Sequence, residues 1–363
     1  MTKREIFQTI LDIVKTDASF CKDKAYIDGK IFLEKISEEM SDLDFLYAVD
    51  NYLCQYKVPG HLSFYKKGFH PSVGFNVMRY DNLLYVTQAH PQSGLLVGDI
   101  IKCIDGVNIK QATEKYSLLL YGEAIERQGQ YWDYIFRYVK NITLERDGKE
   151  FTVNIKQDCP RHEHIPYEFK ELNNNTVYIR FDDFADEPAI ATFIVANEDK
   201  ILQSKNLIID IRDNCGGTDT AWTPLLKYCI NENDKTSGIL DVGGQMEFNY
   251  SVRNSDLRLN LLKKYRKTAL PQTAHHFDEA IRAIKKNRGK GFVIVNDDDP
   301  FDYPTGTALP EKVFILTDCT CASSGEAFVM AVASCSKVTV TGRPTMGILD
   351  YSNLAVANWE IIF

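Results

Sequence analysis

The fold is decided by the stretch Asn206-Leu-Ile-Ile-Asp-Ile-Arg-Asp-Asn-Cys-Gly-Gly217. Its centre is almost continuously apolar, which is typical of a parallel strand covered on both faces of its sheet. The two glycines that follow permit a sharp turn in which backbone N–H groups point outward. The stretch therefore predicts a buried strand that ends in a polar loop at the edge of an α/β sheet.

A second strand of the same kind is Lys312-Val-Phe-Ile-Leu-Thr317, about a hundred residues further along. It leads into Asp318-Cys-Thr-Cys-Ala-Ser-Ser-Gly-Glu-Ala327, and a helical pattern over 327–333 follows. A further strand is predicted over 337–341, so that residues 312–342 form one βαβ unit. Both buried strands thus deliver a polar loop to the carboxyl edge of the predicted sheet.

Other elements of the α/β part are less regular. A strand is predicted over 176–181, and the long stretch 231–305 between the buried strands is predicted to contain helices over 257–265 and 277–288. The end of the chain, 354–363, has a strand-like pattern.

Before this part, the pattern divides the chain into further segments. Residues 1–60 carry apolar residues at helical spacing, and Ser41 is placed to cap a second helix within 31–53. Residues 70–158 read as a small β-rich domain, with strands predicted over 73–77, 83–87, 100–104, 142–146 and 151–155. Residues 160–363 form the α/β domain.

Composition excludes several classes of protein. The net charge of −8 and the pI of about 5.5 give no field that would draw the chain onto a phosphate backbone, so nucleic acid is a poor partner. No run reaches the roughly 18 apolar residues of a membrane span. No signal peptide is recognised, so we expect a cytoplasmic protein, the alternative being an extracytoplasmic one whose leader has been trimmed. The nine cysteines show no pairing pattern and no zinc-ligand spacing, which indicates reduced core thiols.

The two polar loops together supply what acyl transfer needs. Functional groups collect beyond the carboxyl ends of parallel strands, and a serine at a helix N-terminus lies where developing negative charge is favoured. Ser323 or Ser324 would be the hydroxyl nucleophile, and backbone N–H groups near Gly216 and Gly217 would stabilise the oxyanion. The alternative is that the serine is only a helix cap and the diglycine only a tight turn.

The β-rich segment resembles a PDZ domain. The resemblance rests on Ser93-Gly94-Leu95, on Val97-Gly-Asp-Ile-Ile101 and on Ile104-Asp-Gly106. PDZ domains bind a peptide C-terminus by adding it as a strand at a sheet edge. The resemblance implies a carboxylate-binding loop at Val73, Gly74 and Phe75. The alternative is a module that only packs against its neighbours.

The α/β part resembles the tail-specific, or C-terminal processing, serine peptidases. The resemblance rests on the two loops already quoted and on Gly342-Arg-Pro-Thr-Met-Gly347 after them. It implies a crotonase-like α/β core and a nucleophile at Ser323, with Ser324 as its rival. If Ser323 is the nucleophile, the N–H of Ser324 would complete the oxyanion hole with that of Gly216 or Gly217.

The chain departs from this family at the general base. The Ser-Lys members carry a lysine just after the Pro-Thr-x-Gly motif, and this chain has Ile348 there. The tricorn-like branch uses a histidine near the N-terminal helices, and His61 stands at that place. A neutral imidazole can take a serine proton near pH 7. His275 and His276 are rivals without motif support.

The third member of a triad is not assigned. Asp350 and Glu360 are the only acids after the Pro-Thr-x-Gly motif. The chain ends at Phe363, before the downstream segment of the family, which favours a truncated chain or one that has lost activity.

Three functions compete. The first is a serine peptidase acting on peptide or protein substrates, with Ser323 and His61 and with no metal or organic cofactor. The second is an inactive pseudopeptidase that only binds peptides. The third, an acyl-CoA enzyme of the crotonase type, shares the core but has no use for a PDZ-like domain. The oligomeric state is not predicted.

Overall fold

The computed structural model describes residues 1–58, 60–68, 72–122, 124–160, 166–232, 246–269, 271, 274–295, 304–351 and 355–359. The chain forms two compact units. The first comprises Met1–Leu33 and Ile165–Phe363, and the second comprises Glu34–His164.

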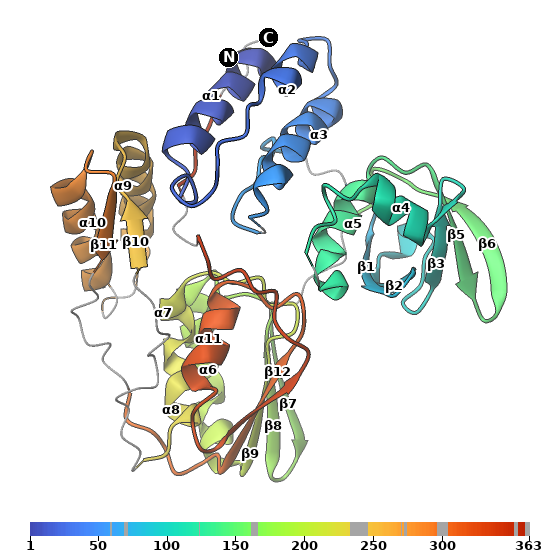
Figure 1. Cartoon of the computed structure of the whole chain (residues 1–363). Helices are drawn as coiled ribbons and strands as arrows, with labels where there is room; N and C mark the ends of the chain where they lie inside the picture. Colours follow the sequence, from blue (N-terminus) through green and yellow to red (C-terminus); the bar gives the residue numbers. More distant parts are fainter. Residues whose placement is uncertain are drawn as a thin grey trace. The chain divides into compact units, whose positions relative to one another are not determined.

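The first unit is built on a five-stranded sheet (Figure 1). Its order is β13-β12-β9-β8-β7, in which the first four strands are mutually parallel and β7 is antiparallel to β8. The strands are β7 (Tyr167–Asn173), β8 (Thr176–Phe181), β9 (Asn206–Asp210), β12 (Lys312–Thr317) and β13 (Val338–Gly342). The strand over 176–181 and the βαβ unit over 312–342 are confirmed.

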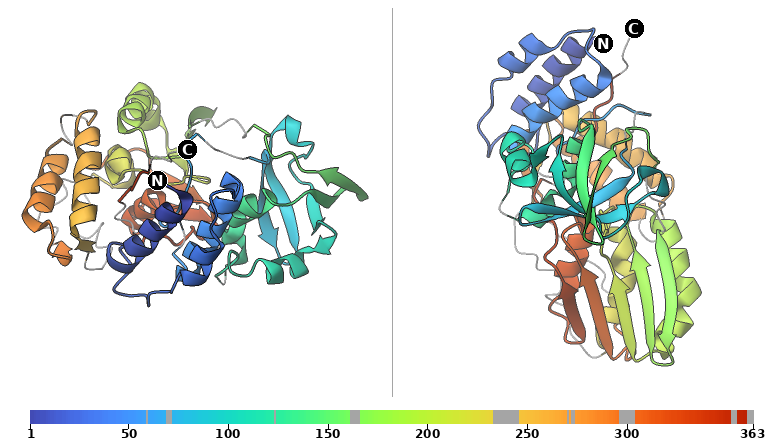
Figure 2. Two further views of the ribbon diagram at one scale, coloured as in Figure 1. Left: turned by 90° about the horizontal axis from the view of Figure 1, so that it is seen from above. Right: turned by 90° about the vertical axis from the view of Figure 1, so that its right-hand side faces the viewer.

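Helices follow β8, β9 and β12. They are α6 (Glu187–Gln203), then α7 (Asp219–Trp222), η4 (Thr223–Leu225) and α8 (Leu226–Cys229), and finally α11 (Ser324–Val332). Each step along the chain moves to the next strand in the same direction across the sheet. Because parallel crossovers are right-handed, these helices fall on one face of the sheet, where Figure 2 shows them.

Burial agrees with this one-sided arrangement. Leu207 and Ile209 of β9 are completely buried with the helices in the largest core, whereas Ile208 between them is only half-buried. The expectation that the buried strands are covered on both faces is therefore wrong within the described residues. The continuous apolar run reflects the alternation of a buried face and a half-buried face.

The first unit also contains an N-terminal helix and a small α/β insertion. The helix α1 (Lys3–Thr16) starts with a capping box between Thr2 and Glu5. It ends against the insertion, where Asn249 donates a hydrogen bond from Nδ2 to the Thr16 carbonyl (3.1 Å). The insertion consists of β10 (Met246–Asn249), α9 (Val252–Arg266), α10 (Ala274–Asn287) and β11 (Phe292–Val295), with its own small core.

The second unit is an antiparallel sheet with helices. The sheet order is β1-β2-β3-β5-β6, and β4 pairs with β3. The strands are β1 (Phe75–Tyr80), β2 (Leu83–Ala89), β3 (Ile100–Ile104), β4 (Val107–Asn108), β5 (Asn141–Arg146) and β6 (Lys149–Asn154). The helical elements in and before it are α2 (Lys30–Lys35), α3 (Asp42–Leu53), η1 (Cys54–Tyr56), η2 (Pro91–Ser93), α4 (Ile109–Lys115), η3 (Ile125–Gln128) and α5 (Gly129–Phe136).

The units divide the chain differently from the three predicted segments 1–60, 70–158 and 160–363. The helix α3 belongs with the β-rich unit, because the rings of Tyr47 and Tyr138 pack 4.6 Å apart and the Tyr138 hydroxyl donates to the Leu43 carbonyl (2.8 Å). The predicted cap at Ser41 is confirmed.

Several elements had not been predicted, among them β7, α5 and α6. The strand predicted over 354–363 is not found in the described part, 355–359, and its other residues lie outside the described residues. No helix of the described chain is both long and apolar enough to cross a bilayer.

A half-buried carboxyl, that of Asp50, joins α3 to α5. Burial raises the pKa of Asp50 to about 7, against a hydrogen bond from Tyr134 and the charge of Arg137. Between about pH 4 and pH 7 the folded chain therefore keeps a proton that the unfolded chain has lost. The free energy of unfolding falls as the pH rises through this window.

Asp50→Asn is expected to abolish that fall. An amide still accepts a hydrogen bond from Tyr134 but has no charge to bury, so the variant should be more stable than the parent chain at pH 8 by about 2 kcal/mol. At pH 5, within the lower part of this window, the difference should be less than half as large. Urea unfolding at both pH values measures this, with Asp147→Asn in an exposed turn as the control. A difference that is the same at pH 5 and pH 8 would contradict the prediction.

Candidate active site

Ser323 lies at the N-cap of α11 in a backbone conformation that helix capping does not require. Its φ is 51° and its ψ is −118°. The capping serines Ser41 and Ser251 have the usual extended values, with φ of −60° and −50°. A non-glycine residue at positive φ costs on the order of 1–3 kcal/mol, and such strain gathers at functional sites. The strained strand-to-helix turn is the one in which a nucleophilic serine is exposed above a sheet.

The diglycine loop lies directly against Ser323. A Cβ atom added to Gly216 would stand 2.8 Å from the Cβ of Ser323 and 3.1 Å from the backbone nitrogen of Ser324. A Cβ on Gly217 would stand 2.2 Å from the carbonyl carbon of Phe184. Both glycines also have positive φ, 92° and 153°. The two loops predicted from the sequence to share one site therefore do so, and glycine is required at both positions.

The backbone N–H groups of this loop differ in their partners. The N–H of Gly216 donates to Oδ1 of Asn214 (2.9 Å), so it is already occupied. Within the described residues, neither the N–H of Gly217 nor that of Ser324 has an acceptor. Of the three predicted oxyanion donors, these two remain for a developing oxyanion.

The hydroxyl of Ser324 is fully engaged. Its Oγ donates to Oδ1 of Asp219 (2.7 Å) and accepts from Nε1 of Trp222 (3.0 Å), and the residue is buried. A buried hydroxyl that is already used both as a donor and as an acceptor is poorly placed to attack a substrate. Of the two candidate serines, Ser323 is therefore the one that the local geometry favours.

The carboxylate of Glu326 fixes the backbone of Ser323. Its Oε2 accepts from the N–H of Ser323 (3.0 Å) and from the N–H of Ile348 (2.9 Å), and its Oε1 accepts from the N–H of Gly347. The residue is only 3% exposed. Glu326 thus ties the strained turn to the end of the Pro-Thr-x-Gly motif. Sequence reasoning quoted this glutamate without giving it a role.

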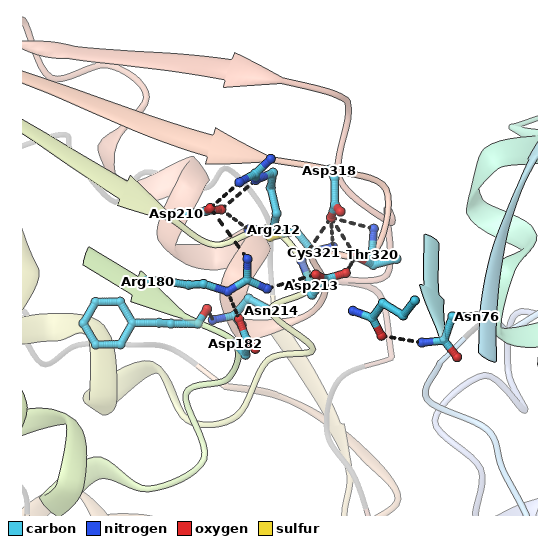
Figure 3. A network of polar contacts seen from close by, with 12 residues as sticks. Asn76, Arg180, Asp182, Asp210, Arg212, Asp213, Asn214, Asp318, Thr320 and Cys321 are labelled. Atoms are coloured by element: carbon cyan, nitrogen blue, oxygen red, sulfur yellow. Dashed lines mark hydrogen bonds and ion pairs between the residues drawn. The ribbon is translucent and has the colours of Figure 1, made fainter. Parts of the chain in front are cut away.

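A network of charged residues lies where β9 leads into the diglycine loop (Figure 3). Asp210, completely buried at the end of β9, accepts two hydrogen bonds from the Arg212 guanidinium (2.9 and 2.6 Å) and one from the Tyr178 hydroxyl (2.8 Å). Burial alone would raise the pKa of Asp210, but these hydrogen bonds outweigh it and lower that pKa. Arg180 joins the network through Asp182 and through Oδ2 of Asp213 (3.0 Å).

Two further residues connect the loops, and sequence reasoning did not single them out. Oδ1 of Asp318 accepts from the N–H groups of Asp213 (3.3 Å), Thr320 (3.0 Å) and Cys321 (3.1 Å). Asn214 is completely buried; its side-chain oxygen accepts from Gly216, and its backbone carbonyl accepts from the N–H of Ala322 (2.8 Å). Both residues stand directly after or near buried strands, a position that could have marked them.

The position after the Pro-Thr-x-Gly motif holds a buried side chain. Ile348 is 5% exposed, and the N–H of Met346 donates to the Cys321 carbonyl (2.8 Å), so the segment runs beside the serine loop. Asp350 is exposed in a turn, and Glu360 lies outside the described residues.

His61 belongs to the other compact unit, Glu34–His164. It is half-buried, in a turn that follows η1 and the left-handed residue Lys57. The rivals His275 and His276 are exposed at the start of α10.

The predicted peptide-binding loop is also in that second unit, and its groups are largely occupied. Val73 and Phe75 are buried in the core of the β-rich unit. The N–H of Gly74 donates to Oγ of Ser72 (3.1 Å), and its carbonyl accepts from the N–H of His90 (2.7 Å). Within the described residues, this loop therefore presents no free backbone donor at Gly74.

Comparison with known proteins identifies the α/β part. Residues 175–355 match the model of peptidase family S41. The chain belongs to peptidase family S41. It is therefore a serine-type peptidase, as the sequence predicted. The matched range contains both loops and the Pro-Thr-x-Gly motif, so the S41 region includes every residue of the first unit assembled around Ser323.

Solved structures support the fold. The chain is similar to mature CPAF complexed with lactacystin, at 10% identity and a TM-score of 0.56, over 96% of this chain and 85% of that one. It is similar to a CPAF mutant at 10% identity and a TM-score of 0.57, over 95% and 84% of the two chains. At this identity the likeness concerns the fold alone.

Proposed function

We propose that this S41 peptidase hydrolyses peptide bonds with Ser323 as nucleophile and His61 as general base. The observation that carries the proposal is the conformation of Ser323, at φ 51°, against Gly216 and beside two backbone N–H groups without acceptors in the described chain. Strain of this kind persists only where the surroundings fix it, and here Glu326 and the diglycine loop do so.

The reaction follows from these groups. His61 takes the proton of the Ser323 hydroxyl while its Oγ attacks the peptide carbonyl carbon, and the carbonyl oxygen becomes an oxyanion held by the N–H groups of Gly217 and Ser324. The protonated imidazole then gives its proton to the leaving amine. Water, deprotonated by the same imidazole, attacks the acyl-enzyme, and the carboxylic acid product leaves with Ser323 restored.

The proposal extends to the finer fold. The one-sided parallel sheet with a serine at the N-terminus of a crossover helix supports a crotonase-like core. The antiparallel unit, with the sequence features of a PDZ domain at 93–106, supports a PDZ-like domain that engages a C-terminal tail.

A serine-directed fluorophosphonate tests the assignment. The full chain should be labelled at Ser323, as located by mass spectrometry, and Ser323→Ala should remove the label. His61→Ala should slow labelling by at least 100-fold, whereas His276→Ala should leave its rate unchanged. If His61→Ala is labelled as fast as the unmodified chain, His61 is not the general base. If the label is found on another residue, Ser323 is not the nucleophile.

A second candidate is a pseudopeptidase that binds peptides without cleaving them. The observation that favours it is the buried Ile348, at the place where the Ser-Lys members carry their base. Its distinguishing result is a folded full chain that binds peptides but takes up no fluorophosphonate at Ser323.

A further inference from the structure

The insertion between β9 and β12 has a charge opposite to that of the rest of the chain. Residues 252–290 contain eleven lysines and arginines and three acidic residues, a formal charge of +8. The whole chain carries −8, so the remainder carries −16. The low pI of the chain therefore conceals a strongly basic segment, which is the helical hairpin α9–α10.

Two ion pairs show the relative direction of the two helices of this hairpin. Arg266, at the end of α9, pairs with Asp278 near the start of α10 (3.0 Å). Arg288, just after α10, pairs with Asp256 near the start of α9 (2.7 Å). The two helices are therefore antiparallel, and these arginines already have carboxylate partners.

The lysines of the hairpin gather near the C-terminal ends of its two helices. All six are exposed: Lys263, Lys264 and Lys267 lie at or just after the end of α9, and Lys285, Lys286 and Lys290 lie at or just after the end of α10. Within the described chain none of the six pairs with a carboxylate. Because the helices are antiparallel, the clusters are at opposite ends of the hairpin, roughly 15–20 Å apart at 1.5 Å per residue.

We propose that the α9–α10 hairpin is a docking site for acidic segments of polypeptide substrates. Six to eight residues in extended conformation span the distance between the two lysine clusters at about 3.3 Å each. This inference rests on the proposed function, since it is a peptidase that recruits polypeptides. The hairpin lies in the same compact unit as Ser323, so acidic polypeptides would be concentrated on the unit that holds the nucleophile.

Features of the hairpin favour a polypeptide over other polyanions. Phosphate recognition commonly uses bidentate arginines, and Arg266 and Arg288 are held by Asp278 and Asp256. A membrane-surface helix needs a free apolar face, but Ile284 of α10 is buried with Phe248 and Tyr250 in the insertion's own core. The charge of −16 elsewhere also opposes adhesion to an extended anionic surface.

Binding of a fluorescein-labelled octaglutamate peptide to the full-length Ser323→Ala chain tests the proposal. Anisotropy should show binding at 50 mM salt that is lost at 300 mM, and octaglutamine should not bind. Replacing Lys263, Lys264 and Lys267 by glutamine, or Lys285, Lys286 and Lys290, should weaken octaglutamate binding about tenfold each. The matched triple variant Lys110→Gln, Lys140→Gln and Lys149→Gln should change it less than twofold.

Different results would contradict the docking proposal in different ways. If the hairpin and control variants lose octaglutamate affinity equally, net charge alone explains the binding and the hairpin is not a docking site. Tighter binding of a 15-nucleotide single strand, or of phosphatidylserine vesicles, with the same lysine dependence would assign the hairpin to nucleic acid or membrane instead. Because the measurement uses Ser323→Ala and reads binding only, a failure here is separate from a failure of the proposed chemistry.

Discussion

Gly216→Ala is expected to slow fluorophosphonate labelling of Ser323 by 100-fold or more while the chain remains folded. The added methyl group would stand 2.8 Å from the Cβ of Ser323 and 3.1 Å from the nitrogen of Ser324. It would therefore push the nucleophile aside and cover one proposed oxyanion donor. The loss of one such donor alone costs about 100- to 1,000-fold in rate.

The control for this variant is a glycine with the same backbone strain but no neighbour. Gly291, in the same unit, has a φ of 71° and nothing within 4 Å of an added Cβ. Gly291→Ala carries the cost of an alanine at positive φ, about 1 kcal/mol, and should label at the rate of the unmodified chain. Thermal unfolding of both variants separates instability from a blocked site. A Gly216→Ala chain that labels normally would show that the diglycine loop does not form the oxyanion hole.

The sequence was sufficient to predict the elements on which the site is built. The strand 312–317 and the loop after it were recognisable because buried parallel strands are apolar runs that end in polar residues. The proximity of Gly216 to Ser323 followed from one rule, that carboxyl ends of parallel strands meet at one edge.

What could not be predicted is the set of contacts that hold those loops. Asn214 donates to the Phe181 carbonyl and Asp318 accepts from the N–H of Asp213, both backbone groups distant in sequence, and no local pattern states which backbone group a buried amide or carboxylate will meet. The long helix α6, Glu187–Gln203, was not predicted, because its apolar residues are not confined to one side of the helix. The sheet's half-buried face was missed because both of its faces carry apolar side chains.

Glu326→Gln is expected to reduce both the stability of the chain and the reactivity of Ser323. Glu326 uses both carboxylate oxygens, Oε2 for Ser323 and Ile348 and Oε1 for Gly347. A glutamine has one oxygen, so its amide group would face a backbone N–H and leave that buried donor unsatisfied, at a cost of about 1–3 kcal/mol. Labelling of Ser323 should slow by about 100-fold, because the backbone that holds the strained turn would lose an anchor.

Asp318→Asn distinguishes positioning by Glu326 from loss of a negative charge. Asp318 accepts from three N–H groups of the same two loops, but all three use Oδ1. An asparagine can keep its oxygen at that place, so Asp318→Asn removes a charge without removing those hydrogen bonds, and labelling should slow less than fivefold. If labelling slows equally in both variants, the negative charge of the loops governs the reactivity of Ser323. If only Glu326→Gln slows it, at temperatures where both are folded, Glu326 is the positioning residue that keeps Ser323 in its reactive conformation.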